Sequence, residues 1–128
     1  MTDETRIDEL IADLRQAPLA VRRAATAELG ASGAAAVEPL IAAMLDGDND
    51  LRWYAARALV QIGEPAIAPL LAAMRAREDR DFRRYAMAAL TGIGEAAVEP
   101  LIGIIESADP ALQPFAAVAI CKIGQPAV

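Results

Sequence analysis

A pattern about thirty residues long recurs along this chain, and it constrains the possible folds more than any other feature of the sequence. The segment from Leu51 to Leu71 reads LRWYAARALVQIGEPAIAPLL, and the segment from Phe82 to Ile102 reads FRRYAMAALTGIGEAAVEPLI. The same frame fits residues 21–41, and its first half returns from residue 112 onward. The first residues of the four copies are spaced by 30, 31 and 30 positions, and they are Val21, Leu51, Phe82 and Leu112. A period in this range is typical of proteins built from stacked repeats.

The first half of each copy has the spacing of an amphipathic helix. Its apolar stripe in the second copy consists of Leu51, Tyr54, Ala55, Ala58, Leu59 and Ile62. We therefore predict first helices over about residues 20–29, 49–62, 80–93 and 110–123. An Asp three residues before the repeat's first residue can accept a hydrogen bond from a free backbone N–H, and the predicted N-caps are Asp48, Asp79 and Asp109. A glycine after the last turn tolerates a left-handed backbone, and the predicted glycines are Gly63, Gly94 and Gly124.

The second half of each copy predicts a second, shorter helix, over about residues 37–45, 67–76 and 98–107. Each of these segments has a proline in its first turn, where the missing N–H would have no partner, so the prolines mark the helix starts. These residues are Pro39, Pro69 and Pro100. The expected buried side of the second helices consists of Leu40, Ile41 and Met44, of Leu70, Leu71 and Met74, and of Leu101, Ile102 and Ile105.

The two ends of the chain complete an expected count of eight helices in a single domain over residues 1–128. Ile7 lies 14 residues before Val21, as Val37 lies before Leu51, so residues of about 6–17 are predicted to form a capping helix equivalent to a second helix. At the other end, the sequence stops at Val128, where the next second helix is expected to begin. Either the chain is a fragment of a longer array, or its last helix docks on another surface, as in a homodimer, or it is a frayed cap. The residues predicted for such an oligomer contact are Phe115, Val118 and Cys121.

The repeated motif resembles a known family. Its frame is an apolar residue followed by Arg-x-x-Ala-x-x-Ala-Leu-x-x-Ile-Gly and then Ala-Val-x-Pro-Leu-Ile, which is similar to the HEAT-like repeats named after phycobilin lyases. Pro18 in the first copy and Gln113 in the fourth depart from it. The resemblance implies an all-α fold, a right-handed α-solenoid of antiparallel helix pairs with about four repeats. It also implies that the second helices line the concave side and hold other macromolecules.

Composition argues against several kinds of activity. The chain has no histidine and one cysteine, so we expect no metal site, no bound cofactor and no catalytic residues. A net charge of −6 argues against nucleic acid as a partner. Because no apolar run approaches the length of a membrane span and the N-terminus does not read as a signal peptide, we expect a cytoplasmic protein that does not bind membranes.

Two columns of equivalent residues are interpreted as structural. Arg22, Arg52 and Arg83 are expected to form a ladder, with Asp48–Arg52 and Asp79–Arg83 as ion pairs four residues apart on one helix. Tyr54, Tyr85 and Phe115 lie in the apolar stripe and are expected to pack between repeats. Trp53 is expected to be partly exposed, because its equivalents are arginines and a proline, and an exposed tryptophan is also a candidate interface residue.

The outward side of the second helices is the predicted working surface. One column is small in every copy and consists of Ala12, Ala42, Ala72 and Gly103. Small residues in line can let another chain approach closely, but alanine is also the best helix former and this chain is rich in it. The predicted partner-binding residues are Glu38, Ala42, Leu45, Ala72, Arg75, Glu99, Gly103 and Glu106. We therefore expect a non-enzymatic scaffold that binds a protein partner there. The alternatives, which depend on the family resemblance, are a subunit of a phycobilin lyase-like enzyme and a protein that binds DNA lesions.

Overall fold

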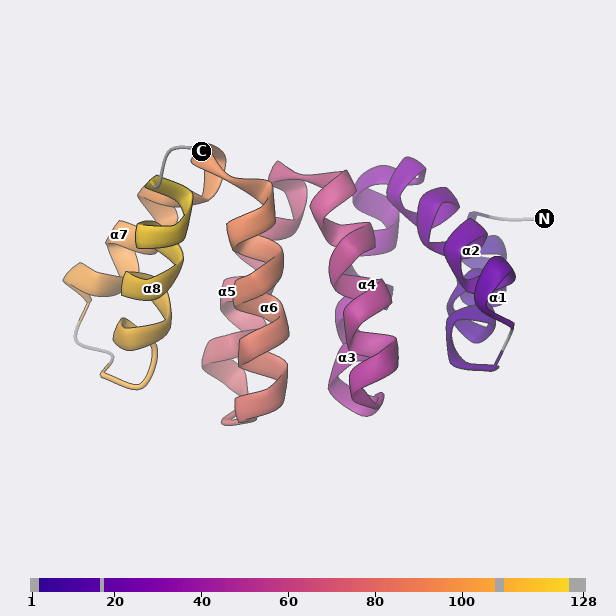
Figure 1. Ribbon diagram of the computed structural model, residues 1–128, viewed down its shortest axis with the longest axis horizontal. Helices are drawn as coiled ribbons and strands as arrows, with labels where there is room; N and C mark the ends of the chain where they lie inside the picture. The colour runs from indigo at the N-terminus through magenta and orange to yellow at the C-terminus, as the bar shows by residue number, and fades with distance from the viewer. Residues whose placement is uncertain (1–2, 17, 108–109, 125–128) are drawn as a thin grey trace.

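The computed structural model describes residues 3–16, 18–107 and 110–124, and within these ranges the chain contains eight α-helices and no strand (Figure 1). The α-helices are α1 (Asp3–Gln16), α2 (Leu19–Ala31), α3 (Val37–Asp46), α4 (Asn49–Ile62), α5 (Ile67–Ala76), α6 (Arg80–Ile93), α7 (Val98–Glu106) and α8 (Gln113–Gly124). Short 3-10 turns at Gly33–Ala36, Glu64–Ala66 and Glu95–Ala97 lead directly into α3, α5 and α7. No single helix in the described part is long and apolar enough to cross a membrane. Among the described residues, one pair of neighbouring helices, α6 and α7, meets the length and composition criteria together, but the pair is bent by 120°.

The helices are arranged in two rows, as the repeat predicts. We call α2, α4, α6 and α8 the A row, and α1, α3, α5 and α7 the B row. Within the A row, α4 packs against both α2 and α6, and α6 packs against α8. Successive B-row helices pack against each other less extensively, while each pair, such as α3 with α4, packs closely. Figure 1 shows the pairs following one another along the long axis, with the described N- and C-terminal helices at opposite ends. The prediction of an all-α solenoid built from helix pairs is confirmed.

The predicted helix ends are found in the central repeats. Asp48 Oδ1 accepts the backbone N–H of Leu51 at 2.9 Å, and Asp79 Oδ1 accepts that of Phe82 at 3.0 Å. The glycines that follow α4 and α6 have φ angles of 83° and 89° respectively, and they are Gly63 and Gly94. Because both ends of α4 and α6 are specified locally, the boundaries of these helices agree with the predicted ones.

The fourth repeat differs from the prediction at both ends of its first helix. The helix α8 begins at Gln113, three residues later than expected, and residues 110–112 form a turn. Gly124 is the last residue of α8 and does not share the positive φ of Gly63. The predicted cap Asp109 lies outside the described residues.

Burial follows the repeat in the centre of the array but not at its ends. Leu51, Phe82 and Leu112 are buried, whereas the equivalent Val21 is 42% exposed. Ile102 and Ile105 were predicted to be buried, and this prediction is wrong because each is 40% exposed. Their equivalents in α3 and α5, including Ile41 and Met74, are buried, but no described helix lies beyond α7 to cover the last pair.

Two glycines should respond in opposite ways to alanine. Gly94 has a φ of 89° and a ψ of −138°, a conformation that a residue with a Cβ rarely adopts. Gly94→Ala should therefore destabilise the protein by about 2 kcal/mol. Gly103 lies inside α7, and a Cβ placed there would meet no atom within 4 Å. Gly103→Ala should stabilise the protein by about 0.5 kcal/mol, since alanine favours helix. Urea unfolding followed by circular dichroism measures both changes. A destabilising Gly103→Ala would contradict the placement of Gly103 inside α7 with open space around it.

Candidate functional site

The arginine column serves the fold rather than a ligand. Arg52 donates from Nε to the carbonyl oxygen of Met44 at 2.9 Å, and Arg83 donates from Nε and Nη2 to that of Met74 at 3.1 and 2.9 Å. Each acceptor lies in the last turn of the preceding B-row helix, where carbonyl groups lack partners within the helix. Gln113, at the equivalent position of α8, donates from Nε2 to Ile105 and Ser107 carbonyls at 3.1 and 2.8 Å. The predicted ladder is therefore a series of side-chain caps on the B row.

The ion pairs predicted within single helices are not the ones found. Among the described residues, Asp48 and Asp79 cap their own helices, and the only ion pair of Arg52 is with Asp79, with Nη2 and Oδ2 3.5 Å apart. This pair joins α4 to the start of the next repeat, while the other guanidinium nitrogens of Arg52 donate to the Met44 carbonyl and to Asn49 Oδ1. The predicted Asp48–Arg52 and Asp79–Arg83 pairs are thus wrong, and the observed one links neighbouring repeats.

The first repeat has a weaker version of the same contact. Arg22 Nη2 lies 3.5 Å from the carbonyl oxygen of Arg15, and its Nε is buried with no hydrogen-bond partner among the described residues. Its guanidinium carbon lies 5.8 Å from the centroid of the Tyr54 ring. At this distance the ring face attracts the cation and gives the group a partner other than a hydrogen bond.

The aromatic column packs between A-row helices, as predicted. Tyr54 is buried, and Tyr85 and Phe115 are partly buried against the core. Trp53 is 49% exposed, also as predicted. It meets Tyr54 edge to face, with ring centroids 5.0 Å apart, and the Arg57 guanidinium lies 4.7 Å from the centroid of its ring. These contacts give Trp53 a packing role on the outer side of α4.

The column of small residues on the B row points to solvent along its whole length. Its four members, one on each B-row helix, are all exposed, and they are Ala12, Ala42, Ala72 and Gly103. The flanking Glu38, Arg75, Glu99 and Glu106 are exposed as well, while Leu45 is partly buried against the core. We call the set Glu38, Ala42, Leu45, Ala72, Arg75, Glu99, Gly103 and Glu106 the B face. Successive B-row helices from α1 to α5 pack side by side, so the members of the B face on α3 and α5 lie on one surface, and small side chains run along its middle.

The residues of the B face supply charge and small side chains. Within the described residues, no three side chains of His, Cys, Asp or Glu come together where they could hold a metal ion. The arrangement can therefore offer contact area, helix-borne carboxylates and an arginine to another molecule.

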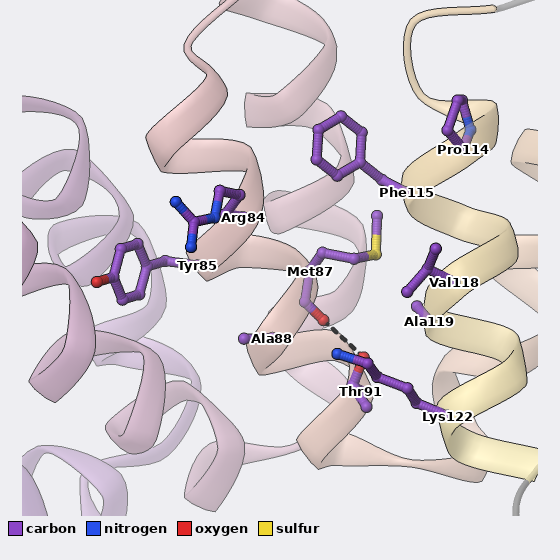
Figure 2. A pocket seen from close by; sticks show the side chains of 10 residues that line it. All are labelled: Arg84, Tyr85, Met87, Ala88, Thr91, Pro114, Phe115, Val118, Ala119 and Lys122. Atoms are coloured by element: carbon purple, nitrogen blue, oxygen red, sulfur yellow. Dashed lines mark hydrogen bonds between the residues drawn. The ribbon is translucent and has the colours of Figure 1, made fainter.

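A second surface, which the sequence analysis did not identify, lies on the other row. A groove of about 630 Å³ runs between α6 and α8, and Figure 2 shows its lining side chains. Two of the three residues predicted for an oligomer contact, Phe115 and Val118, lie in this lining and so face α6. Cys121 is exposed on α8 and is not part of the lining. A contact between two copies through these residues stays a prediction.

The sequence did contain a signal for this groove. Ala88 and Val118 occupy the place that Arg57 holds in α4, so the long side chain that covers α4 is missing from both α6 and α8. A comparison of the copies for side-chain size, rather than for apolar periodicity alone, would have pointed to the last pair of A-row helices.

The fold and its surfaces define an α-solenoid that presents side chains from repeated helix pairs. The HEAT repeats family matches residues 7–88 of the chain, and the chain belongs to this family. It is also similar to a protein of Pseudanabaena tenuis named "Uncharacterized phycocyanin operon protein Z", with 46% identity over 61 residues. That segment covers 47% of this chain and 30% of the relative, so the match spans less than a third of the relative's length.

Proposed function

We propose that this protein is a non-enzymatic scaffold that binds a protein partner on the B face. The observation that supports this most directly is the exposed column of Ala12, Ala42, Ala72 and Gly103, which repeats on every B-row helix. Side chains this small let the backbone of a partner helix or strand approach closely. Because the column is carried by regular helices, its residues are already ordered locally before a partner binds, and little local conformational freedom is lost.

The charges beside the column favour a basic partner. Glu38, Glu99 and Glu106 are exposed on the B face, and Arg75 is its one basic residue. The chain as a whole carries a net charge of −6, so its field attracts cationic segments over a longer range. We expect the partner segment to carry Lys or Arg opposite these carboxylates, and we expect added salt to slow its association.

Bulky substitutions in the column test this proposal. A partner is first recovered and identified with the wild-type chain, and its Kd is then measured with purified proteins by titration calorimetry. Ala42→Trp and Ala72→Trp should each weaken binding at least about tenfold, because an indole would hold the partner away from the surface. Both side chains are exposed, so the thermal unfolding temperature should change little.

A matched control separates the B face from the rest of the surface. Ala27 is an equally exposed alanine on the A-row helix α2, and Ala27→Trp should leave the Kd unchanged. Unchanged binding by Ala42→Trp and Ala72→Trp, or an equal loss with Ala27→Trp, would contradict binding on the B face.

The similarity to a phycocyanin operon protein favours a second candidate, a role in handling a bilin chromophore. Incubating the chain with a free bilin and recording the visible absorption spectrum tests this candidate. A shifted and intensified band is expected if the chromophore is held in one conformation. A spectrum identical to that of the free bilin would remove this candidate and leave the scaffold proposal intact.

A further inference from the structure

The groove between α6 and α8 has the size and lining of a small-molecule site. Its volume of about 630 Å³ lies within the range of typical ligand pockets, about 300–1,000 Å³. Its lining includes the apolar side chains of Met87, Ala88, Phe115 and Val118. Figure 2 shows Phe115 extending from α8 toward α6, with Met87 between the two helices. The groove is therefore bounded by both helices and floored by apolar groups.

The groove belongs to the last pair of A-row helices because of their sequences. On α4, the positions equivalent to Arg84 and Ala88 carry Trp53 and Arg57. The Arg57 guanidinium stacks on the Trp53 ring, with its carbon 4.7 Å from the ring centroid. A large stacked pair thus stands on α4 at the positions where α6 has Arg84 and the small Ala88.

A positive charge lies at one end of the groove. Lys122, in the last turn of α8, extends across to α6 beside Thr91, as Figure 2 shows, and it has no ion-pair partner among the described residues. Arg84 also lines the groove, but Figure 2 shows its guanidinium turned away from α8, and its Nη1 lies 4.0 Å from Asp81 Oδ1 in an exposed pair of little strength. No acidic residue of the described part lines the groove. The charge at the groove is therefore positive, opposite in sign to the net charge of −6 of the whole chain.

We propose that this groove binds a small amphipathic organic anion, with an apolar body on Met87, Ala88, Phe115 and Val118 and an acidic group at Lys122. Arg84 and Thr91 are seven residues apart on α6, so the apolar body spans about 10 Å, given the rise of a helix. A span of two helical turns suits a small molecule better than a helical peptide, which would need a longer binding surface. The site lies on the A row and does not depend on the function proposed for the B face.

The dye anilinonaphthalenesulfonate and its neutral analogue phenylnaphthylamine are suitable probes, since they share an aromatic body and differ in the anionic group. Fluorescence titration of the wild-type chain should show saturable binding of the anionic dye. Lys122→Gln should weaken binding of the anionic dye about fivefold to tenfold and leave the neutral dye unaffected, because a charge-assisted contact is lost. Ala88→Trp should weaken binding of both dyes at least about tenfold by filling the groove.

Two controls make these results decisive. Ala27 occupies the position in α2 that Ala88 occupies in α6, so Ala27→Trp should change neither affinity. Far-ultraviolet circular dichroism and the thermal unfolding temperature show that each variant is folded. If the wild-type chain fails to bind the dye, or if Lys122→Gln and Ala88→Trp leave binding unchanged because the dye sits on the exposed Ile102 and Ile105, the proposal is overturned.

Discussion

Replacing Phe82 by alanine should lower the free energy of unfolding by about 3–5 kcal/mol, the range measured for aromatic side chains deleted from protein cores. Phe82 is the first residue of its repeat, and its side chain is 0% exposed. Its removal would leave a cavity between α6 and the elements around it, and their packing can close such a cavity only in part. Urea unfolding followed by circular dichroism measures the loss.

The repeat itself supplies the control for this experiment. Val21 occupies the equivalent position in the first copy, but it is 42% exposed. Val21→Ala should therefore cost less than about 1 kcal/mol, because little apolar surface returns to water. Equal losses in the two variants would show that repeat position, rather than burial, determines the energetic contribution.

Replacing Arg83 by alanine should destabilise the protein by about 2–4 kcal/mol. Its guanidinium is buried and donates two hydrogen bonds to the carbonyl oxygen of Met74, at 3.1 and 2.9 Å. Truncation removes these charge-assisted bonds and leaves the carbonyl at the end of α5 without its partner, which costs about 1–3 kcal/mol for a buried group. The packing of the aliphatic part of the side chain is lost as well. The shift in the midpoint of urea unfolding reports the sum.

Glutamine should recover part of the stability lost in Arg83→Ala. The fourth repeat already has Gln113 at this position, and its Nε2 donates to the Ile105 and Ser107 carbonyls. Arg83→Gln should therefore lose less than half of what Arg83→Ala loses. If the two variants were equally unstable, the capping of the B-row carbonyl would not be the reason for the arginine.

The parts of the fold that local chemistry specifies could be predicted from the sequence. Asp48 and Asp79 cap helices, and Gly63 and Gly94 end them, for reasons that depend on a few neighbouring residues. The apolar stripe that predicts burial is equally local, and it held for Leu51 and Phe82, whose neighbouring repeats are present on both sides.

The features that the sequence did not predict correctly share a physical cause, because all of them depend on contacts with a neighbouring repeat. The partner of Arg52 is Asp79 rather than Asp48, since the direction of the side chain is set by a carbonyl on α3. Ile102 and Ile105 are exposed because burial of this face requires a further helix that the described chain does not place there. The groove between α6 and α8 depends on which side chains face each other across two helices, and a single amphipathic pattern does not carry that information.

The uneven packing of the two rows gives the array a spine. The A-row helices pack closely against one another along the molecule, whereas the B-row helices pack against each other less. Bending of the array should therefore change the distances between B-row helices more than those between A-row helices. The separation between Ala72 and Gly103 should then change most, because α5 and α7 pack against each other less than α3 and α5 do. A partner held against both residues would fix the curvature of this part of the array.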